Sequence, residues 1–254
     1  MFIDTHTHLY DEAFAPEEDS AVLRAAEAGV GKLILPDTDT KVRASLFALA
    51  RRHPGVAYAT LGLHPEEVRE NWKDEMKALQ EWPDKDIVAI GEIGLDYHWS
   101  REFEKEQGIV FREQLEMASC LNLPVIVHVR DAMEATLKVL REMKHLNLRG
   151  VMHAYSGSIE SFREIQKLGD WYVGIGGVLT YKKASIAETI KDIPLERILL
   201  ETDSPYLTPV PFRGKRNESS YIPVIAEKVA VCKEISIEEV EATTTSNAEK
   251  LFRI

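Results

Sequence analysis

The feature that most limits the fold of this chain is a regular alternation of short apolar segments with longer amphipathic ones. The apolar segments are about four to six residues long and nearly continuous in apolarity, which is typical of strands buried on both faces of a parallel sheet. We expect eight strands: Phe2–Thr5, Lys32–Pro36, Val56–Leu61, Ile87–Ile90, Pro124–His128, Gly150–His153, Trp171–Ile175 and Ile198–Glu201.

The segments between these strands predict helices, because their apolar residues recur at helical spacing and several have start and stop signals. Eight strands alternating with helices in 254 residues predict an α/β fold, a (β/α)₈ TIM barrel forming a single domain over residues 1–254. The alternative, an open doubly wound sheet, lacks its glycine-rich loop, since His-x-His follows the first strand. The expected helices are Pro16–Ala28, Thr40–Arg52, Glu102–Leu121, Asp131–Met143, Ile159–Leu168, Ser185–Ile190, Tyr221–Glu234 and Glu238–Phe252.

The composition narrows the class of protein. The chain has 31 Lys and Arg against 42 Asp and Glu, and its net charge of −11 argues against a broad basic surface that coats nucleic acid. Cys120 and Cys232 are too few and too far apart for a disulfide framework or a cysteine-based zinc site. Because no long apolar run and no signal peptide are present, we expect a cytoplasmic protein without a membrane partner. No segment indicates an obligate protein partner.

Polar side chains cluster at the ends of the expected strands, and five of the eight histidines lie there. In a barrel these ends open on one mouth, where active sites form. Imidazoles and carboxylates without thiolates suit Zn, Mn, Ni or Mg. Seven such groups exceed what one tetrahedral ion needs and predict two divalent cations bridged by a carboxylate. The candidates are His6, His8, His64, Glu92, His128, His153 and Asp203.

Several motifs occur in order along the chain: FIDTHTHL, LGLHP, GEIGLDYH, VIVHVRDA, HAYSG, GIGG, LLETDSPYL and SNAEKLF. With these motifs the sequence resembles the TatD family of metal-dependent hydrolases over residues 2–253. The resemblance implies a TIM barrel with one or two divalent cations and, for several members, deoxyribonuclease activity, often as Mg-dependent exonucleases. It also implies a first ion held by His6, His8, Glu92 and Asp203, a second held by Glu92, His128 and His153, and His64 near the substrate.

From these residues we predict hydrolysis of DNA by a metal-activated water, possibly from a 3′ end, with Asp203 as the general base. His64 is expected to donate a hydrogen bond to the developing negative charge, and Glu201 to orient the ligands. The alternative is hydrolysis of an ester, lactone, amide or aminoacyl linkage, because the same donors polarise a carbonyl. A barrel that binds metal but has lost catalysis is a third possibility, which the full set of expected ligands disfavours.

The expected partner is a DNA end or another phosphoester, bound transiently through a few side chains. Arg130 suits a phosphate oxygen, although an ion pair with Asp131 or Asp96 is an equal alternative. Arg213 and Lys215 lie in the loop 211–216, which is either a contact for the nucleic-acid backbone or a solvated surface loop. Tyr155 and Trp99 are expected near strand ends, where they could stack bases or simply pack against the rim.

Overall fold

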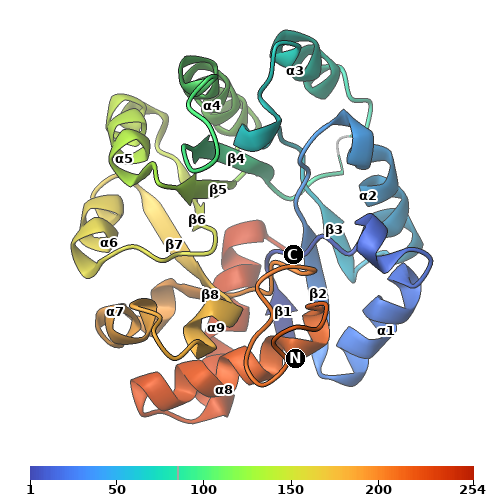
Figure 1. Cartoon of the computed structure of the whole chain (residues 1–254), viewed down its shortest axis with the longest axis vertical. Coiled ribbons are helices and arrows are strands. Elements are labelled where there is room, and N and C mark those ends of the chain that lie inside the picture. Colours follow the sequence, from blue (N-terminus) through green and yellow to red (C-terminus); the bar gives the residue numbers. More distant parts are fainter. Residues whose placement is uncertain (85) are drawn as a thin grey trace.

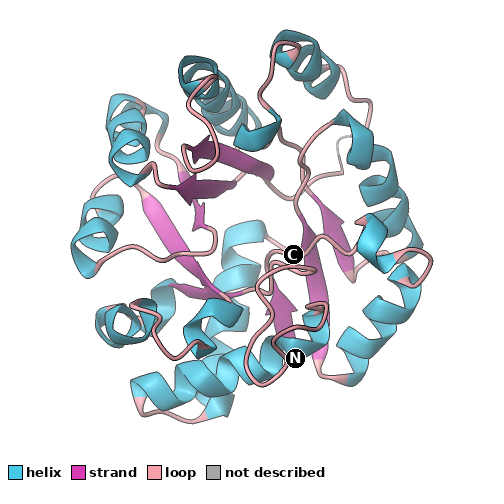
Figure 2. Ribbon diagram, viewed as in Figure 1, coloured by secondary structure: helices cyan, strands magenta, loops and turns pink. Residues whose placement is uncertain are grey.

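Parallel strands form the inside of the molecule, and helices surround them (Figures 1 and 2). The computed structural model describes residues 1–84 and 86–254. Every β4 residue is buried, as expected for a strand covered on both faces. The strands are β1 (Phe2–Asp4), β2 (Val30–Leu35), β3 (Ala57–Ala59), β4 (Ile90–Asp96), β5 (Val125–Arg130), β6 (Arg149–Met152), β7 (Asp170–Ile175) and β8 (Ile198–Leu200).

The strands form two parallel ladders, β1-β2-β3 and β4-β5-β6-β7-β8. At the seam between β3 and β4, the ladder is reduced to an isolated bridge between Leu61 and Ile90. The seam between β8 and β1 has a bridge between Thr7 and Ser204, and the N–H of Thr5 donates to the carbonyl of Leu200 at 3.0 Å. The arrangement is therefore TIM-barrel-like, with continuous ladders interrupted at these two seams.

One apolar cluster occupies the space that the strands enclose. It includes one inward residue from six of the strands and Ala89 just before β4, and Tyr58 of β3 packs against it. The last helix, α9 (Ile237–Phe252), adds Ala248, Leu251 and Phe252 to the same cluster. The interior is thus filled at one end, which leaves the opposite end, where the strands finish, for polar side chains. The six inward residues are Ile3, Ile34, Ile126, Val151, Tyr172 and Leu199.

Side-chain caps fix where several of the surrounding helices begin. The carboxylate of Asp39 accepts from the N–H groups of Lys41 and Val42 at the start of α2 (Thr40–Arg52), and Ser158 caps α6 (Ile159–Gln166). None of the helices within 1–84 and 86–254 has the length and apolarity needed to cross a bilayer. The remaining helices are α1 (Glu18–Glu27), α3 (Trp72–Gln80), α4 (Glu104–Leu121), α5 (Met133–Glu142), α7 (Ile186–Asp192) and α8 (Ile222–Lys233).

The predicted α/β class and its barrel-like arrangement are confirmed, whereas one strand and one helix differ from expectation. The sequence predicted a strand over 87–90, but β4 begins at Ile90 and runs to Asp96. The prediction stopped early because Gly91, Glu92 and Gly94 interrupt the apolar run. Helix α3 was not among the predicted helices, since charged residues separate its few buried positions, Met76 and Leu79 among them.

Candidate metal centre

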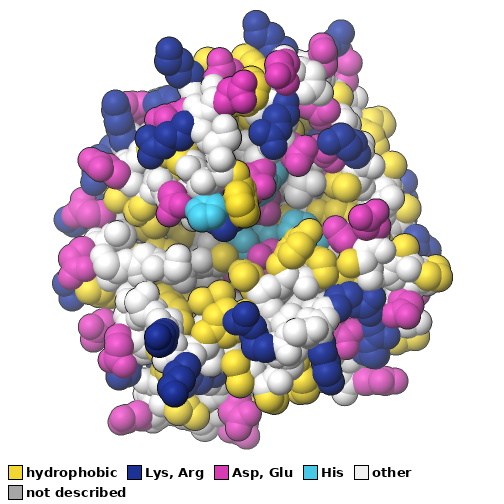
Figure 3. Space-filling model, in the orientation of Figure 1, with side chains coloured by type: hydrophobic (Ala, Val, Ile, Leu, Met, Phe, Trp, Pro, Cys, Tyr) yellow, Lys and Arg dark blue, Asp and Glu magenta, His cyan; other side chains and the backbone are white. Residues whose placement is uncertain are grey.

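The seven polar side chains singled out in the sequence surround one hollow, and histidine and acidic side chains are visible at its floor (Figure 3). Ion pairs and close nitrogen contacts link them across both ladders. The strand ends therefore converge as the barrel topology requires. His6 and His8 follow β1, His64 follows β3, Glu92 and His128 lie within β4 and β5, His153 follows β6, and Asp203 follows β8.

His6 and His8 point to the same side, with their Nε2 atoms 3.2 Å apart. The Tyr10 hydroxyl donates to the carbonyl of Pro36, so it accepts from Nδ1–H of His8, 2.7 Å away. This tautomer leaves the Nε2 lone pair of His8 directed into the centre. Burial lowers the pKa of His6, which favours a neutral ring. Two neutral imidazoles that face one point are suited to a cation.

Glu92 lies between two groups of imidazoles. Its Oε2 is 3.1 Å from Nε2 of His6, whereas its Oε1 is 2.8 Å from Nδ1 of His128 and 3.4 Å from Nε2 of His64. Burial alone would raise the pKa of Glu92, but His6, His64 and His153 hold it well below the usual value. The side chain is therefore an ionised carboxylate whose two oxygens serve different neighbours, as a bridging ligand requires.

His128 has carboxylates at both ring nitrogens. Nδ1 lies 2.8 Å from Glu92, and Nε2 lies 2.8 Å from Oδ2 of Asp96. Burial opposes protonation, but the contacts with Asp96 and Glu92 prevail and raise the pKa of His128 to about 9. The same pairing lowers the pKa of Asp96 to about 2 against the effect of its burial. A cation at this ring would therefore replace a proton.

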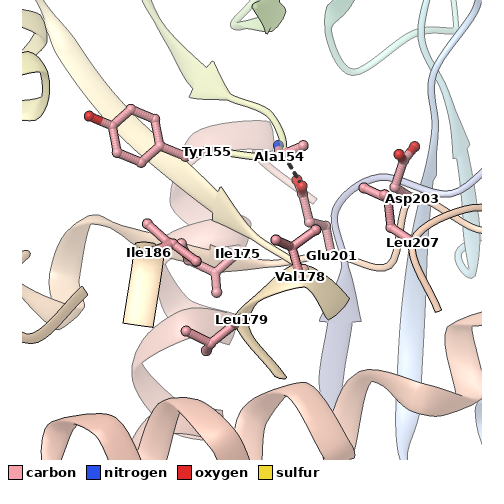
Figure 4. Close-up of a pocket in the computed structure, with 10 residues that line it drawn as sticks. Ala154, Tyr155, Ile175, Val178, Leu179, Ile186, Glu201, Asp203 and Leu207 are labelled. Atoms are coloured by element: carbon pink, nitrogen blue, oxygen red, sulfur yellow. Dashed lines mark hydrogen bonds between the residues drawn. The ribbon is translucent and has the colours of Figure 1, made fainter. Parts of the chain in front are cut away.

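His153 lies beside Glu201, whose carboxylate and hydrogen bond to Ala154 are drawn in Figure 4. Oε1 of Glu201 accepts from the N–H of Ala154 at 2.6 Å and lies 3.0 Å from Nδ1 of His153. Burial would lower the pKa of His153, but the charges of Glu201 and Glu92 raise it to about 10. A Cβ at position 174 would lie 2.0 Å from Oε2 of Glu201, so a side chain there would displace this carboxylate. The geometry fits the predicted orienting role of Glu201.

Asp203 completes the cluster from the β8 side. Its Oδ1 is 3.4 Å from Nε2 of His8, 3.6 Å from Nε2 of His6 and 3.8 Å from Nε2 of His153. The pKa of Asp203 is lowered despite burial, because His153 and His8 favour the charged form. Its backbone adopts a left-handed conformation with φ of 58°, and its N–H donates to the carbonyl of His6 at 2.9 Å. Such a conformation is costly outside glycine, so the surroundings hold this residue in place.

His64 is the N-cap of a short 3₁₀ helix, Pro65–Glu67. Its Nδ1 accepts from the N–H of Glu66 at 3.2 Å, so its proton resides on Nε2 when the ring is neutral. Nε2 lies 3.4 Å from Oε1 of Glu92, at the edge of the cluster. The ring therefore presents an N–H donor to the hollow, which fits the expected role near a substrate.

Two of the predicted substrate contacts come from neighbouring strands, since Arg130 ends β5 and Tyr155 follows β6. The Arg130 guanidinium stacks over the Trp99 ring at 5.2 Å, so neither of the ion pairs considered from the sequence engages it among the described residues. Tyr155 is 4% exposed, and its hydroxyl donates to the carbonyl of Ser158. In Figure 4 that hydroxyl points away from Glu201 and Asp203. Tyr155 therefore presents little ring surface to a substrate.

The basic loop 211–216 keeps two of its three cations at the surface. Arg213 lies 4.2 Å over the ring of Tyr181, and Lys215 lies 5.8 Å from the ring of Phe212. Arg216 instead pairs with Glu17. The structure thus leaves Arg213 and Lys215 exposed beside aromatic rings, and their contact with a nucleic acid stays a prediction.

Sequence reasoning missed buried acids that organise the backbone of the site. Asp4 accepts from the N–H of Thr202 at 3.0 Å, from its hydroxyl at 2.6 Å and from the N–H of His6 at 3.3 Å. Burial raises the pKa of Asp4 to about 7. It ties β1 to the segment after β8, on which Asp203 lies. An acidic residue inside an apolar strand was the available signal.

A second missed pair lies behind Glu92. Nε of Arg43 donates to Oδ2 of Asp37 at 2.7 Å, and both side chains are fully buried. The backbone of Asp37 donates to the carbonyl of Gly91 at 3.0 Å and accepts from the N–H of Glu92 at 2.8 Å. This buried pair therefore supports the backbone that places the central carboxylate.

The donor residues form four groups of three, and within each group every ligand atom lies within 4.8 Å of the others. Oxygen and imidazole nitrogen are the only donors in these groups, which suits Zn, Mn or Ni and, with more oxygen or water, Mg. The residues therefore fit a divalent metal. The groups are His6, His8 and Asp203; His6, His153 and Glu201; and His64, Glu92 and His128, and a fourth set at the rim contains Glu66, Asp96 and His128.

Comparison with known proteins agrees with a metal-dependent site. A family model described as TatD related DNase matches residues 3–253. The uncharacterized metal-dependent hydrolase YabD of Bacillus subtilis is 38% identical over 256 residues, which cover 100% of both chains. The 3′-5′ ssDNA/RNA exonuclease TatD of Erwinia tasmaniensis is 32% identical, with 99% of each chain covered. The crystal structure of YjjV, a TatD homologue from Escherichia coli K12, superposes with a TM-score of 0.90 at 31% identity, covering 100% of this chain and 98% of that one.

Proposed function

The chain belongs to the TatD family of metal-dependent hydrolases, and from this premise we propose that it is a deoxyribonuclease that hydrolyses phosphodiester bonds. The observation that carries the proposal is Glu92, whose two carboxylate oxygens face separate groups of imidazoles. The description of the family and the name of the Erwinia relative support DNA as the substrate and removal of nucleotides from a 3′ end.

Two divalent ions fit the cluster in this proposal. His6, His8, Glu92 and Asp203 would hold one of them, and Glu92, His128 and His153 the other. When bound, such ions polarise a phosphoryl oxygen and make water a stronger acid. The four histidines among the donors favour Zn, Mn or Ni, whereas Mg prefers oxygen ligands.

Asp203 is the proposed general base. Its lowered pKa keeps the carboxylate ionised at neutral pH, so Oδ1 can accept the proton of the attacking water. Its side chain is 16% exposed, which gives water access from the hollow. The backbone contact with His6 fixes its position relative to the other donors.

The remaining proposed roles belong to residues around this base. The Nε2–H of His64 can donate to a phosphoryl oxygen as negative charge develops there. Arg130 places a guanidinium at the end of β5, where it can contact a phosphate. Arg213 and Lys215 extend a positive rim for the DNA backbone, and Glu201 keeps His153 oriented.

The test is a comparison of substrates with metal-loaded protein. Single-stranded and double-stranded DNA labelled at the 5′ end are incubated with Mg²⁺ or Mn²⁺, with and without EDTA, beside aryl esters and lactones. We expect metal-dependent shortening of DNA that Asp203→Ala lowers by about 10²- to 10⁴-fold, the usual contribution of a general base. Arg130→Ala should retain metal but weaken binding of DNA.

The alternative function is hydrolysis of an ester, lactone, amide or aminoacyl linkage at the same centre. Rapid turnover of such a substrate by a protein that leaves DNA intact under every metal condition would overturn the proposal. Elemental analysis without Zn, Mn or Ni, and no uptake of these ions, would contradict the ligand set itself.

A further inference from the structure

Trp99 is an exposed aromatic side chain that neither the core nor the proposed centre uses. The residue is 72% exposed and lies in the segment 97–103 between β4 and α4. Tryptophan has the largest apolar ring of any residue and is normally covered for most of its area. Tryptophan is enriched at binding interfaces, and this ring lines a polar cavity.

The Trp99 ring is held in place although it is exposed. The guanidinium of Arg130 lies 5.2 Å over one face, and the ring of His98 meets it edge to face at 4.7 Å. His98 is fixed in turn, since its Nδ1 lies 2.7 Å from Asp131 and its N–H donates to Oδ1 of Asp96 at 2.9 Å. The ring therefore needs little further ordering when it binds a flat group.

Trp99 borders a cavity of about 290 Å³ that shares a wall with the centre. The side chain shared by the cavity and the centre is that of Asp96, whose Oδ2 lies 2.8 Å from Nε2 of His128. The volume is at the lower end of the range for small-molecule sites. A group in the cavity would thus be next to the hydrolytic cluster. The lining residues are Glu66, Arg69, Asp96, Trp99, Ser100 and Gln107.

We propose that Trp99 and this cavity form a subsite that stacks one nucleobase of the substrate, a proposal that rests on the function proposed above. Every base has a flat π face, so an aromatic platform binds bases of any sequence. Arg130 covers one face of the ring and leaves the other for the base. Arg69 is exposed and forms no ion pair within the described part of the chain, so its charge is available to the adjoining phosphate.

The experiment compares two ligands that differ only in the base. Binding of dAMP and of 2-deoxyribose 5-phosphate to the Mn²⁺-loaded full-length protein is measured by calorimetry for the wild type, Trp99→Ala and Trp99→Phe. Leu23→Ala is the matched control, since Leu23 is 61% exposed on the outer helix α1. Hydrolysis of a single-stranded oligonucleotide and of methyl p-nitrophenyl phosphate, a diester without a base, is measured in parallel.

We expect Trp99→Ala to weaken dAMP binding by about 5- to 150-fold, the range for loss of one stacked base. Trp99→Phe should keep most of the affinity, and the deoxyribose phosphate should bind all four proteins alike. In the hydrolysis assay, Trp99→Ala should raise KM for the oligonucleotide more than Trp99→Phe does, with little change in kcat.

An unchanged dAMP affinity in Trp99→Ala, in a wild type that degrades DNA, would overturn the subsite and leave the proposed function intact. Equal weakening of dAMP and deoxyribose phosphate would also overturn it, because it would show a structural role for the ring. Failure of the wild type to hydrolyse either phosphodiester would overturn the proposed function and, with it, the assignment to a nucleobase.

Discussion

Replacement of Arg43 by methionine tests how the buried pair behind Glu92 supports the site. Methionine keeps the apolar stem and removes the charge, so Asp37 loses its partner in a fully buried position. The carbonyl of Gly62 also loses a donor at 3.3 Å. The guanidinium is charged at every accessible pH and lowers the pKa of Asp37, but burial prevails and raises that pKa to about 7.

The expected loss of unfolding free energy depends on whether Asp37 takes up a proton when Arg43 is removed. Breaking a buried ion pair by removing one partner costs about 3–5 kcal/mol. Burial raises the pKa of Asp37, Arg43 opposes that rise, and the carboxyl of the variant should therefore take up a proton. Because the wild-type carboxyl already binds a proton below about pH 7, the variant differs from it in protonation only above that pH, by about 1.4 kcal/mol for each further pH unit. This difference is the upper limit of the pH-dependent part of the loss in unfolding free energy.

The loss of stability in the variant should depend on pH because the folded and unfolded states bind different numbers of protons. In the variant, the folded state keeps a proton that the unfolded chain releases above about pH 4, so the folded state is favoured less as the pH rises. Urea unfolding followed by circular dichroism at pH 7, 8 and 9 should show a loss of unfolding free energy that grows with pH. Asp37→Asn combined with Arg43→Met should remove most of this dependence. A loss below 1 kcal/mol at pH 7, or one independent of pH, would refute the reasoning.

Three further predictions concern the metal centre. Glu92→Gln should lower metal occupancy in elemental analysis, and normal occupancy would contradict its bridging position. Metal uptake should displace protons from His128 and His153, whose pKa values are raised to about 9 and about 10, so affinity should fall up to about 100-fold when the pH drops from 8 to 7. Calorimetry in buffers of different ionisation enthalpy measures the protons released, and none released would disprove the exchange. Gly174→Ala should displace Glu201 and destabilise the fold by about 1–3 kcal/mol in thermal unfolding, while an unchanged melting temperature would show that the site accepts a methyl group.

The order of strands along the chain was enough to predict which side chains meet, because parallel strands in a barrel end on the same side. His6 and His153 are distant in sequence, yet their rings stack with centroids 3.5 Å apart. The strand over 87–90 was misplaced because Glu92 and its flanking glycines look like the end of a strand. Burial of that acid is possible only through partners from other strands, which a local pattern does not contain.

The residues that orient the cluster could not be predicted, because their partners depend on the register between separate segments. Asp96 reaches His128 across 32 positions of sequence, and Asp4 reaches Thr202 across 198. The position of each acid in or at the end of an apolar strand was a signal of burial, but it did not identify the partner. The same reason explains Tyr155, which follows a predicted strand but turns its hydroxyl toward Ser158 and is buried.

The two seams of the barrel give the metal centre a mechanical consequence. His6, His8 and His64 follow strands of the shorter ladder, whereas Glu92, His128, His153 and Asp203 belong to the longer one. A cation shared by both groups would link the two ladders in addition to the backbone hydrogen bonds that join them at the seams. Loss of that cation should therefore weaken the hydrogen bonds of the Thr5 and Leu61 backbone amides, at the seams, before those inside each ladder. The cation that activity requires would then also stabilise the barrel.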